Sequence, residues 1–506
     1  MTSEDPSPTV AIIGAGPGGL ATARWLKAAG KRAVVFEAGD DLGGQWNPGA
    51  PHSATWPGMR TNTSRVMTAF SDLDHPEGTA VYPTREQMHA YLKAYADRFA
   101  LAADIRFGCR VRGMTREQGG WRLDWQTEQG AETARFERVI VATGRQVEAS
   151  LPDIPGLDGF TGRLGSRHTS AYRGPEEWQD ASVLVAGCSI SALEIATELA
   201  HRSGGVAVAY RRQRYVLPKQ IVGVPTDHVM FTRAAALMAE RFPPEAVAEG
   251  LRAQVLKVAG NPADWGAQTP HGNVFAAGIT QSQGFLPAVS EGRIATKPWI
   301  ERIDGNTVRF ADGSALAVDG ILLGTGYALS LPFLSRETAD ALKLNSQGMD
   351  LYAQTYHPDL PGLAFVGLYD LLGPYLPVLE LQARWVARTV AHPELLPEVD
   401  SMAEVIAATP PEFRRPPAMP MNAVALMFAR LLGAEPSPED WPGLERALMF
   451  GPLSPASFRL AGSDALADAP ERTLAAAAVF GHIATEELTG EEQGLLDALK
   501  GAAAPA

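Results

Sequence analysis

Three glycines near the N-terminus have the spacing of a turn that binds phosphate groups. Gly14, Gly16 and Gly19 form the pattern G-x-G-x-x-G, and the short apolar run 9–13 precedes them. In such a turn the first glycine permits the tight bend, the second lets the backbone approach a pyrophosphate, and the third lets the helix pack against the strand. Glu37 follows at the distance where a ribose hydroxyl needs an acceptor. These residue types predict binding of a dinucleotide and leave open which one.

The segments around these glycines predict the strands and the helix that position them. Residues 10–13 and 33–36 are short apolar runs, and residues 20–29 are alanine-rich with helical spacing. This order is that of a β-α-β unit, whose helix N-terminus offers N–H groups and a partial positive charge to phosphates. Glycine-rich turns also arise by chance in a chain with 50 glycines, so the flanking elements are what favour dinucleotide binding.

A degenerate copy of this unit follows in the middle of the chain. Residues 182–186 form an apolar run, the turn 187–192 carries Ser189 and Ala192 at glycine positions, and residues 206–210 form a second strand. Two arginines stand where the first copy has its acid, and a guanidinium there matches the 2′-phosphate of NADPH. The second copy therefore predicts an NADPH site that includes Ser189, Ser191, Arg211 and Arg212.

The pairing of the two copies decides between the ligands open to the first turn. The acid Glu37 rejects a 2′-phosphate, so the first turn takes FAD or NAD. Two adjacent pyridine nucleotides would provide no useful redox reaction, whereas FAD beside NADPH allows hydride transfer from NADPH to the flavin. We therefore expect FAD in the first copy and NADPH in the second. A merely solvated basic surface is the alternative for the second copy, because Arg214 and Lys219 lie close by.

After each β-α-β copy the spacing of the hydrophobic residues changes to a period of two, so the duplication includes the segments that follow the two copies. Residues 105–142 and 300–318 alternate with a period of two, as in a β-meander, and an apolar strand followed by Thr-Gly comes at or just after each end. We expect an α/β fold with two Rossmann-like dinucleotide-binding domains, the NADPH domain inserted in the FAD domain, each with a β-meander. We expect a disordered leader at residues 1–8 and the first part of the FAD domain at 9–160. The NADPH domain is expected at 161–324, and the second part of the FAD domain, with a C-terminal helical cover, at 325–506.

Two helical regions outside the copies are also predicted. Residues 82–99 are amphipathic, with Thr84 as N-cap and Gln87 three positions later, the spacing of a capping box. Residues 227–260 are helical with a break at the two prolines 243–244.

Composition and cysteine content narrow the class of reaction. Lys and Arg number 44 against 57 Asp and Glu, and the net charge of −13 argues against nucleic acid or an anionic membrane as the main partner. The two cysteines, Cys109 and Cys188, form no C-x-x-C, which excludes a disulfide reductase and favours a reducing, cytoplasmic setting. The N-terminus is acidic and polar, unlike a signal peptide, and no apolar run reaches the roughly 18 residues of a membrane helix. With a disulfide acceptor excluded, the reduced flavin is left with a quinone-type or small-molecule acceptor or with O₂. We expect no metal site.

Several short segments resemble blocks of the flavin-containing monooxygenases, the class B flavoprotein monooxygenases. The similar segments run nearly end to end, at residues 43–47 (GGQWN), 59–65 (MRTNTSR), 81–99, 142–144, 325–327, 380–385 and 450–462. The family pattern F-x-G-x-x-x-H-x-x-x-Y/F is matched by Phe160, Gly162, His168 and Tyr172, with two extra residues before the histidine. The second turn resembles that of the bacterial trimethylamine monooxygenases.

The resemblance implies a monooxygenase reaction. NADPH would reduce FAD, and O₂ would form a C4a-hydroperoxyflavin that oxygenates nitrogen or sulfur of small soft nucleophiles such as amines and sulfides. A Baeyer–Villiger monooxygenase acting on ketones and an uncoupled NADPH oxidase are the alternative enzymes, and a non-catalytic flavin-binding protein is the alternative outside catalysis. The resemblance is compatible with a homodimer.

The resemblance also implies site residues. Asn62 matches the catalytic asparagine beside the flavin, where an amide can form hydrogen bonds without protonating the oxygen adduct. His168 matches a residue that forms hydrogen bonds at a domain junction. With the glycine turn included, the expected FAD-binding residues are Gly14, Gly16, Gly19, Glu37, Gly44, Gln45, Trp46, His52, Asn62, Thr63, Val111, Thr143 and Gln382. For NADPH, Arg60 and Tyr172 join the residues of the second turn.

Overall fold

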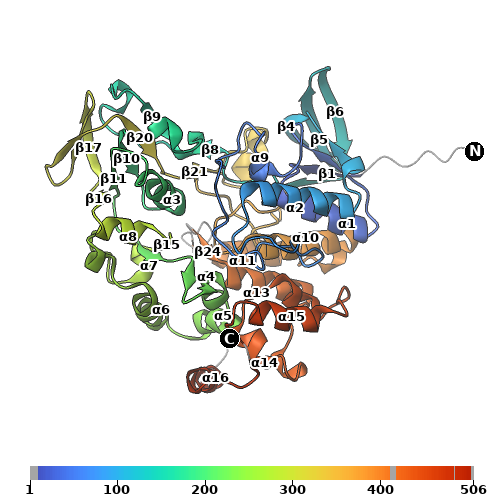
Figure 1. The fold of residues 1–506 in the computed structure, drawn as a ribbon. Helices are drawn as coiled ribbons and strands as arrows, with labels where there is room; N and C mark the ends of the chain where they lie inside the picture. The colour runs from blue at the N-terminus through green and yellow to red at the C-terminus, as the bar shows by residue number, and fades with distance from the viewer. Residues whose placement is uncertain (1–8, 411–417, 484, 503–506) are drawn as a thin grey trace, which may run out of the picture. The chain divides into compact units, whose positions relative to one another are not determined.

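The computed structural model describes residues 9–410, 418–483 and 485–502, which fall into two compact units (Figure 1). Unit 1 comprises Met1–Ser53, Thr63–Glu148 and Ala328–Ala477, and unit 2 comprises Ala54–Asn62, Ala149–Tyr327 and Ala478–Ala506. The expected leader, residues 1–8, lies outside the described residues. The chain therefore passes between the units five times.

A five-stranded parallel sheet forms the centre of unit 1. Its order is β22-β7-β1-β2-β3, with strands β1 (Val10–Ile13), β2 (Ala33–Phe36), β3 (Ile105–Arg106), β7 (Arg138–Val141) and β22 (Leu363–Phe365). Successive residues of β1 enter different cores, Val10 and Ile12 on one face and Ala11 and Ile13 on the other. Because both faces are covered, this strand is apolar throughout rather than alternating.

Helices cover one face of this sheet and a meander covers the other. Helix α1 (Pro17–Ala28) packs against α10 (Leu376–Ala391), and the two lie side by side in Figure 1. The meander consists of the antiparallel strands β4 (Arg110–Glu117), β5 (Gly120–Thr127) and β6 (Gly130–Phe136). Helix α2 (Arg85–Arg98) begins with the predicted capping box, in which Thr84 and Gln87 bond each other's backbone N–H groups.

Unit 2 repeats this plan. Its five-stranded parallel sheet has the order β16-β11-β10-β20-β9, with strands β9 (Gly165–His168), β10 (Ser182–Ala186), β11 (Gly205–Ala209), β16 (Ile294–Lys297) and β20 (Gly320–Leu323). Helix α3 (Ile190–Leu199) connects β10 to β11, and the meander is β17 (Ile300–Asp304), β18 (Thr307–Phe310) and β19 (Ala315–Ala317). The predicted α/β fold with two dinucleotide-type sheets and two meanders is confirmed.

The helical region predicted over residues 227–260 has one more break than expected. It forms α4 (Thr226–Met230), α5 (Arg233–Arg241) and α6 (Pro244–Ala259). The additional break falls at Thr232, whose hydroxyl accepts a hydrogen bond from Ala235 N and caps α5. A threonine inside an apolar helical pattern competes with the backbone in this way, which the hydrophobic spacing alone does not reveal.

The remaining described elements are short strands and peripheral helices. The helices are α7 (Val274–Ala277), α8 (Phe285–Ser290), α9 (Arg336–Ala341), α11 (Val399–Ala408), α13 (Met421–Leu432), α14 (Glu445–Phe450), α15 (Ala469–Ala478) and α16 (Gly490–Gly501). The strands are β8 (Glu148–Ala149), β12 (Tyr215–Leu217), β13 (Gln220–Ile221), β14 (Val224–Pro225), β15 (Ile279–Gln281), β21 (Tyr327–Ala328), β23 (Leu371–Leu372) and β24 (Met419–Pro420). Across the part of the chain that the structure describes, no helix combines the length and apolar character needed to cross a membrane.

Candidate functional site

Packing inside unit 1 requires two of the three glycines of the first turn. Gly14 has φ +105°, and a Cβ there would lie 2.6 Å from the carbonyl oxygen of Ala142. A Cβ on Gly19 would lie 1.9 Å from the carbonyl oxygen of Gly14. Both distances are far below a van der Waals contact, so the turn itself excludes any side chain at these positions.

The middle glycine is not required by the protein's own packing. Gly16 has an ordinary φ of −75°, and a Cβ there would meet only Gly44 Cα at 3.6 Å. Gly16 is also the N-cap of α1, and no side chain caps the N–H groups of the first helical turn. The backbone of Gly16 and Gly44 thus forms a cradle that a Cβ would fill and that fits a pyrophosphate.

Glu37 braces the same turn from the end of β2. One carboxylate oxygen accepts from Ala15 N at 2.8 Å and the other from Gly39 N at 2.8 Å. A carboxylate oxygen accepts more than one hydrogen bond, so the buried acid keeps capacity for a ribose hydroxyl. Burial lowers the pKa of nearby His52, and the charge of Glu37 opposes that shift.

Thr143 supplies a polar atom at the carboxyl end of β7. Its hydroxyl is buried and, among the described residues, has no hydrogen-bond partner. A Cβ on Gly14 would lie 3.3 Å from Thr143 Cα, so this hydroxyl belongs to the surroundings of the glycine turn. A buried hydroxyl without a partner is costly unless a ligand bonds it, and this position therefore fits FAD.

The other predicted FAD residues of unit 1 lie on three segments. Gln45 and Trp46 follow Gly44 in a short 3₁₀ turn, and the Ser53 hydroxyl donates to the carbonyl of Gln45 at 2.7 Å. The hydroxyls of Thr63 and Thr68 lie 2.7 Å apart. Val111, on β4, packs partly buried against the core under the meander. Their contacts with FAD stay predictions.

Gln382 is fully engaged within the protein. On α10, its side-chain oxygen accepts from Gly367 N at 3.0 Å and from the Tyr369 hydroxyl at 2.9 Å. Its amide nitrogen donates to Thr355 Oγ1 at 2.8 Å and to the Phe365 carbonyl at 3.0 Å. The side chain therefore fixes the end of β22 to α10, and direct contact with FAD stays a prediction.

The second turn, in unit 2, keeps the geometry of the first with fewer glycines. Gly187 has φ +135°, and a Cβ there would lie 2.3 Å from the carbonyl oxygen of Gly324. Ala192 fits because Gly324 faces it: a Cβ on Gly324 would lie 2.7 Å from Ala192 Cβ. Ser189 is the N-cap of α3, and its hydroxyl donates to Gly324 O at 3.4 Å, while Ser191 is exposed on the first turn of the helix.

Three arginines follow β11, and each is held differently. The Arg211 guanidinium lies over the Trp299 ring, 4.6 Å from its centroid, whereas Arg212 Nη1 donates to the Ala276 carbonyl at 2.8 Å. Both side chains are exposed. Arg214 is more buried, which lowers its pKa, and Cys188 opposes the shift. The arrangement places positive charge at the carboxyl end of β11, as a 2′-phosphate requires.

Tyr172 contacts residues of unit 2. It is buried in the core of unit 2, its ring meets Trp56 edge-to-face at 5.6 Å, and its hydroxyl donates to Glu198 at 3.0 Å. His168 is buried, and its Nδ1 accepts from Ser170 N at 3.1 Å, in keeping with a residue that forms structural hydrogen bonds. Contact of Tyr172 with NADPH stays a prediction.

Asn62 and Arg60 lie on the segment Ala54–Asn62, which belongs to unit 2. Arg60 is exposed and Asn62 is half-buried. Thr63, the next residue, belongs to unit 1. The proposed catalytic asparagine is thus the last residue that the second unit contributes before the chain returns to the first.

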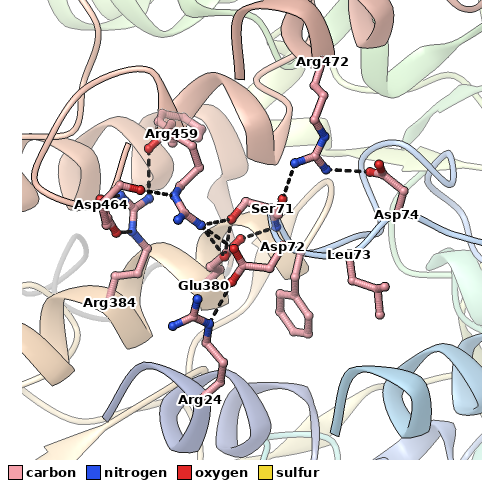
Figure 2. Close-up of polar contacts among 12 residues, drawn as sticks. Arg24, Ser71, Asp72, Leu73, Asp74, Glu380, Arg384, Arg459, Asp464 and Arg472 are labelled. Carbon is pink, nitrogen blue, oxygen red and sulfur yellow. Dashed lines mark hydrogen bonds and ion pairs between the residues drawn. The ribbon is translucent and has the colours of Figure 1, made fainter. Parts of the chain in front are cut away.

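A buried cluster of charges, which sequence reasoning missed, joins α1, α10 and the C-terminal part of unit 1 (Figure 2). The Asp72 carboxylate accepts from Arg24 Nε and Arg459 Nη1, each at 2.8 Å. Glu380, on α10, accepts from Ser71 N at 2.7 Å and from the Ser71 hydroxyl at 2.6 Å. The cluster fixes the glycine-turn helix to the helix that carries Gln382.

The rest of this cluster surrounds one indole. The guanidinium carbons of Arg24, Arg459 and Arg384 lie 3.8, 4.9 and 5.4 Å from the centroid of the Trp25 ring. Arg384 also makes a two-bond ion pair with Asp464, at 2.9 and 2.8 Å. No sequence signal identifies these partners, because the arginines that pair with Asp72 and Asp464 lie from 48 to 387 residues away in sequence.

Comparison with known proteins agrees with this geometry over nearly the whole chain. The family described as flavin-binding monooxygenase-like matches residues 7–478. Flavin-containing monooxygenase 5 of Oryctolagus cuniculus is 27% identical over 481 residues, covering 90% of this chain and 89% of the relative. Flavin-containing monooxygenase 1 of Homo sapiens is 28% identical over 482 residues, with coverage of 90% and 89%.

Solved structures show the same fold. S-allyl-L-cysteine S-oxygenase of Allium sativum aligns with a TM-score of 0.61 at 21% identity, covering 97% of both chains. Cyclohexanone monooxygenase of Rhodococcus sp. Phi1, bound to NADP⁺, aligns with a TM-score of 0.59 at 22% identity, covering 77% of this chain and 85% of the other.

Proposed function

The chain belongs to the flavin-binding monooxygenase-like family and is an FAD- and NADPH-dependent monooxygenase, and from that premise we propose that it oxygenates nitrogen or sulfur of small amines or sulfides. The similarity to flavin-containing monooxygenases and to an S-allyl-L-cysteine S-oxygenase supports this substrate class. The opposite charge at the ends of the two dinucleotide units supports the assignment of the cofactors. Glu37 follows β2, and Arg211 and Arg212 follow β11. One unit therefore suits FAD and the other suits NADPH.

The residues of unit 1 would hold FAD through backbone and acid. The N-terminus of α1 and the cradle at Gly16 and Gly44 would bind the pyrophosphate, because N–H groups and the helix dipole favour negative charge there. Glu37 would accept from a ribose hydroxyl, and the Thr143 hydroxyl would gain the partner that it lacks among the described residues. Bound FAD would supply the chemistry of accepting a hydride from NADPH and activating O₂.

The residues of unit 2 would hold NADPH. The N-terminus of α3, with Ser189 and Ser191, would bind its pyrophosphate. Arg211 is the better placed of the two exposed arginines, because its contact with the Trp299 ring is a cation–π contact and needs no N–H donor. Arg212, in contrast, uses one donor on the Ala276 carbonyl.

Asn62 is the proposed catalytic residue. A carboxamide offers two N–H donors and one acceptor and has no proton to release at neutral pH. It would therefore hydrogen-bond activated oxygen without protonating it, which keeps the oxygen from leaving as peroxide. An acid at the same position would lack this property.

One assay tests the proposal. The purified yellow holoprotein is mixed with NADPH in air and with trimethylamine, methyl phenyl sulfide or cyclohexanone, while NADPH, peroxide and product are measured. We expect NADPH consumption matched by N-oxide or sulfoxide. Lactone from cyclohexanone without N- or S-oxides would show a Baeyer–Villiger monooxygenase, peroxide alone would show an NADPH oxidase, and no consumption would refute every enzymatic function.

We further propose that the protein works in the cytoplasm. Cys109 and Cys188 are both free and buried, and free thiols are usual in a reducing compartment. Fractionation of the native cells tests this location. Sedimentation of the holoprotein tests whether it forms the homodimer that the family resemblance allows.

A further inference from the structure

The short segment Ala54–Asn62 belongs to unit 2, although it is flanked in sequence by residues of unit 1. Both neighbouring stretches of sequence, Met1–Ser53 and Thr63–Glu148, belong to unit 1. Nine residues without a helix or strand of their own need specific contacts to stay in one place. Two such anchors are present, one near the middle of the segment and one next to Asn62.

Trp56 makes the first anchor. It is buried, its ring meets the Tyr172 ring edge-to-face at 5.6 Å, and its indole N–H bonds the carboxylate of Glu198 on α3. The Tyr172 hydroxyl donates to the same carboxylate at 3.0 Å. Glu198 therefore holds both partners of the aromatic pair, and Met59 continues the contact with the same core.

Lys219 makes the second anchor. Its side chain is an uncommon buried lysine, with 9% of the residue exposed. Nζ lies 3.1 Å from Glu194 Oε2 on α3 and donates to the carbonyl of Thr61 at 3.5 Å. This carbonyl is half of the peptide bond to Asn62, so the contact acts directly on the backbone of the proposed catalytic residue.

The position of Lys219 is itself fixed. Its backbone N–H donates to Gln283 Oε1 at 2.9 Å, and its carbonyl accepts from Thr226 N at 2.9 Å. The backbone that carries the ammonium group is thus fixed by hydrogen bonds at both its N–H and its carbonyl. Movement of the Thr61 carbonyl would leave a buried charge with one partner fewer, which is costly.

Both anchors end on the same helix. Glu194 and Glu198 are four residues apart on α3 and so lie on one face, one turn above the other. The N-terminus of α3 is the end that would bind the pyrophosphate of NADPH. One rigid element therefore contacts the nucleotide at its end and the Asn62 segment along its side.

We propose that α3 positions Asn62 through the contacts Glu194–Lys219–Thr61 and Glu198–Trp56, which makes Lys219 a positioning residue for oxygen transfer. The proposal rests on the role given to Asn62 under the proposed function. Unit 2 then sets the place of the proposed catalytic asparagine. Anchoring at positions 56 and 61 leaves no residue between the last anchor and Asn62.

The test uses the FAD-bound holoprotein and the variant Lys219→Met, with Lys27→Met as matched control. Lys27 makes the same type of contact in unit 1, to Asp104 at 3.3 Å and to the Ala100 carbonyl at 2.7 Å, but is exposed. Amide hydrogen exchange of residues 54–62 should become at least about tenfold faster in Lys219→Met, because a charged hydrogen bond is lost, and should not change in Lys27→Met. The share of NADPH electrons released as peroxide should rise only in Lys219→Met.

The double variant Asn62→Asp with Lys219→Met separates positioning from general destabilisation. If Lys219 acts through Asn62, the second substitution adds no further peroxide to that of Asn62→Asp alone. Unchanged exchange of residues 54–62 in Lys219→Met, or an additive rise in peroxide, would overturn the inference. If Asn62→Asp by itself leaves coupling intact, the proposed role of Asn62 fails instead. Should Lys219→Met not fold with FAD, Glu194→Gln replaces it in the same comparison.

Discussion

Arg459 Nη1 lies 2.8 Å from Asp72 Oδ1, although 387 residues separate the two in sequence. Only 3% of the arginine side chain and 8% of the aspartate side chain are exposed. The second Asp72 oxygen bonds Arg24 on α1, so one carboxylate joins the N-terminal helix to the C-terminal part of unit 1. In Figure 2 the three side chains converge beside Glu380. The helix of the first glycine turn thus depends on residues from the far end of the chain.

We predict that Asp72→Asn strongly destabilises unit 1. The substitution leaves two buried guanidinium groups without their shared carboxylate, and loss of one partner of a buried ion pair costs about 3–5 kcal/mol. Thermal unfolding followed by flavin release should show a Tm lower by on the order of 5–10 °C. Asp104→Asn, which removes an exposed ion pair with Lys27, should change the stability by less than about 1 kcal/mol. Equal Tm shifts in the two variants would contradict this prediction.

His228 is predicted to make unit 2 sensitive to acid. Burial, with a smaller contribution from His482, lowers the pKa of His228 from 6.5 to about 3. The unfolded chain binds a proton at this histidine below pH 6.5 and the folded chain does not, so its contribution to stability is present above pH 6.5 and lost as the pH falls towards 3. At pH 5 the loss is about 2 kcal/mol.

The variant His228→Leu should therefore unfold with less dependence on pH. The measurement is the fall in Tm between pH 7 and pH 5, which should be smaller in His228→Leu than in the unaltered protein. His201→Gln, at an exposed histidine, should keep the full fall. An undiminished fall in His228→Leu would show that other groups carry the acid sensitivity.

Selection of NADPH over NADH is predicted to depend on Arg211 and, to a lesser degree, on Trp299. Arg211→Ala should weaken binding of 2′,5′-ADP by roughly 10- to 100-fold, because a charge-assisted phosphate contact is worth ~1.5–3 kcal/mol. Trp299→Leu should weaken it by about two- to fivefold through loss of the cation–π contact. Calorimetric titration with 2′,5′-ADP and 5′-ADP measures both. An unchanged ratio of the two affinities in Arg211→Ala would show that Arg211 does not bind the 2′-phosphate.

Local patterns in the sequence sufficed for most of the fold and part of the site. The glycine turn, the strands of both β-α-β units, both meanders and the Thr84–Gln87 capping box depend on residues close in sequence, and the spacing of these residues indicates the local structure. The extra helix break at Thr232 did not follow, because it depends on one hydroxyl rather than on hydrophobic spacing.

Long-range contacts could not be predicted. Asp72 and Arg459 are ordinary charged residues in sequence, and only the tertiary fold buries them together. Likewise the sequence indicated Lys219 only as part of an alternative, a solvated basic surface, whereas its ammonium group is buried between Glu194 and the Thr61 carbonyl. The bond from the Tyr172 hydroxyl to Glu198 in the core of unit 2 also had no signal in the sequence. In each case the partner is supplied by a distant segment.

Finally, two alanine substitutions in the first turn should fail for different reasons. Gly19→Ala should not fold, because its Cβ would lie 1.9 Å from the carbonyl oxygen of Gly14. Gly16→Ala should fold, because its Cβ meets only Gly44 Cα at an ordinary 3.6 Å, but it should bind FAD at least about tenfold more weakly, since the methyl group fills the pyrophosphate cradle. Far-UV circular dichroism together with the ratio of flavin to protein absorbance distinguishes the two. Gly250→Ala, where a Cβ meets nothing within 4 Å on helix α6, should keep both signals. A Gly16→Ala protein with full flavin content would show that the pyrophosphate does not lie against this part of the backbone.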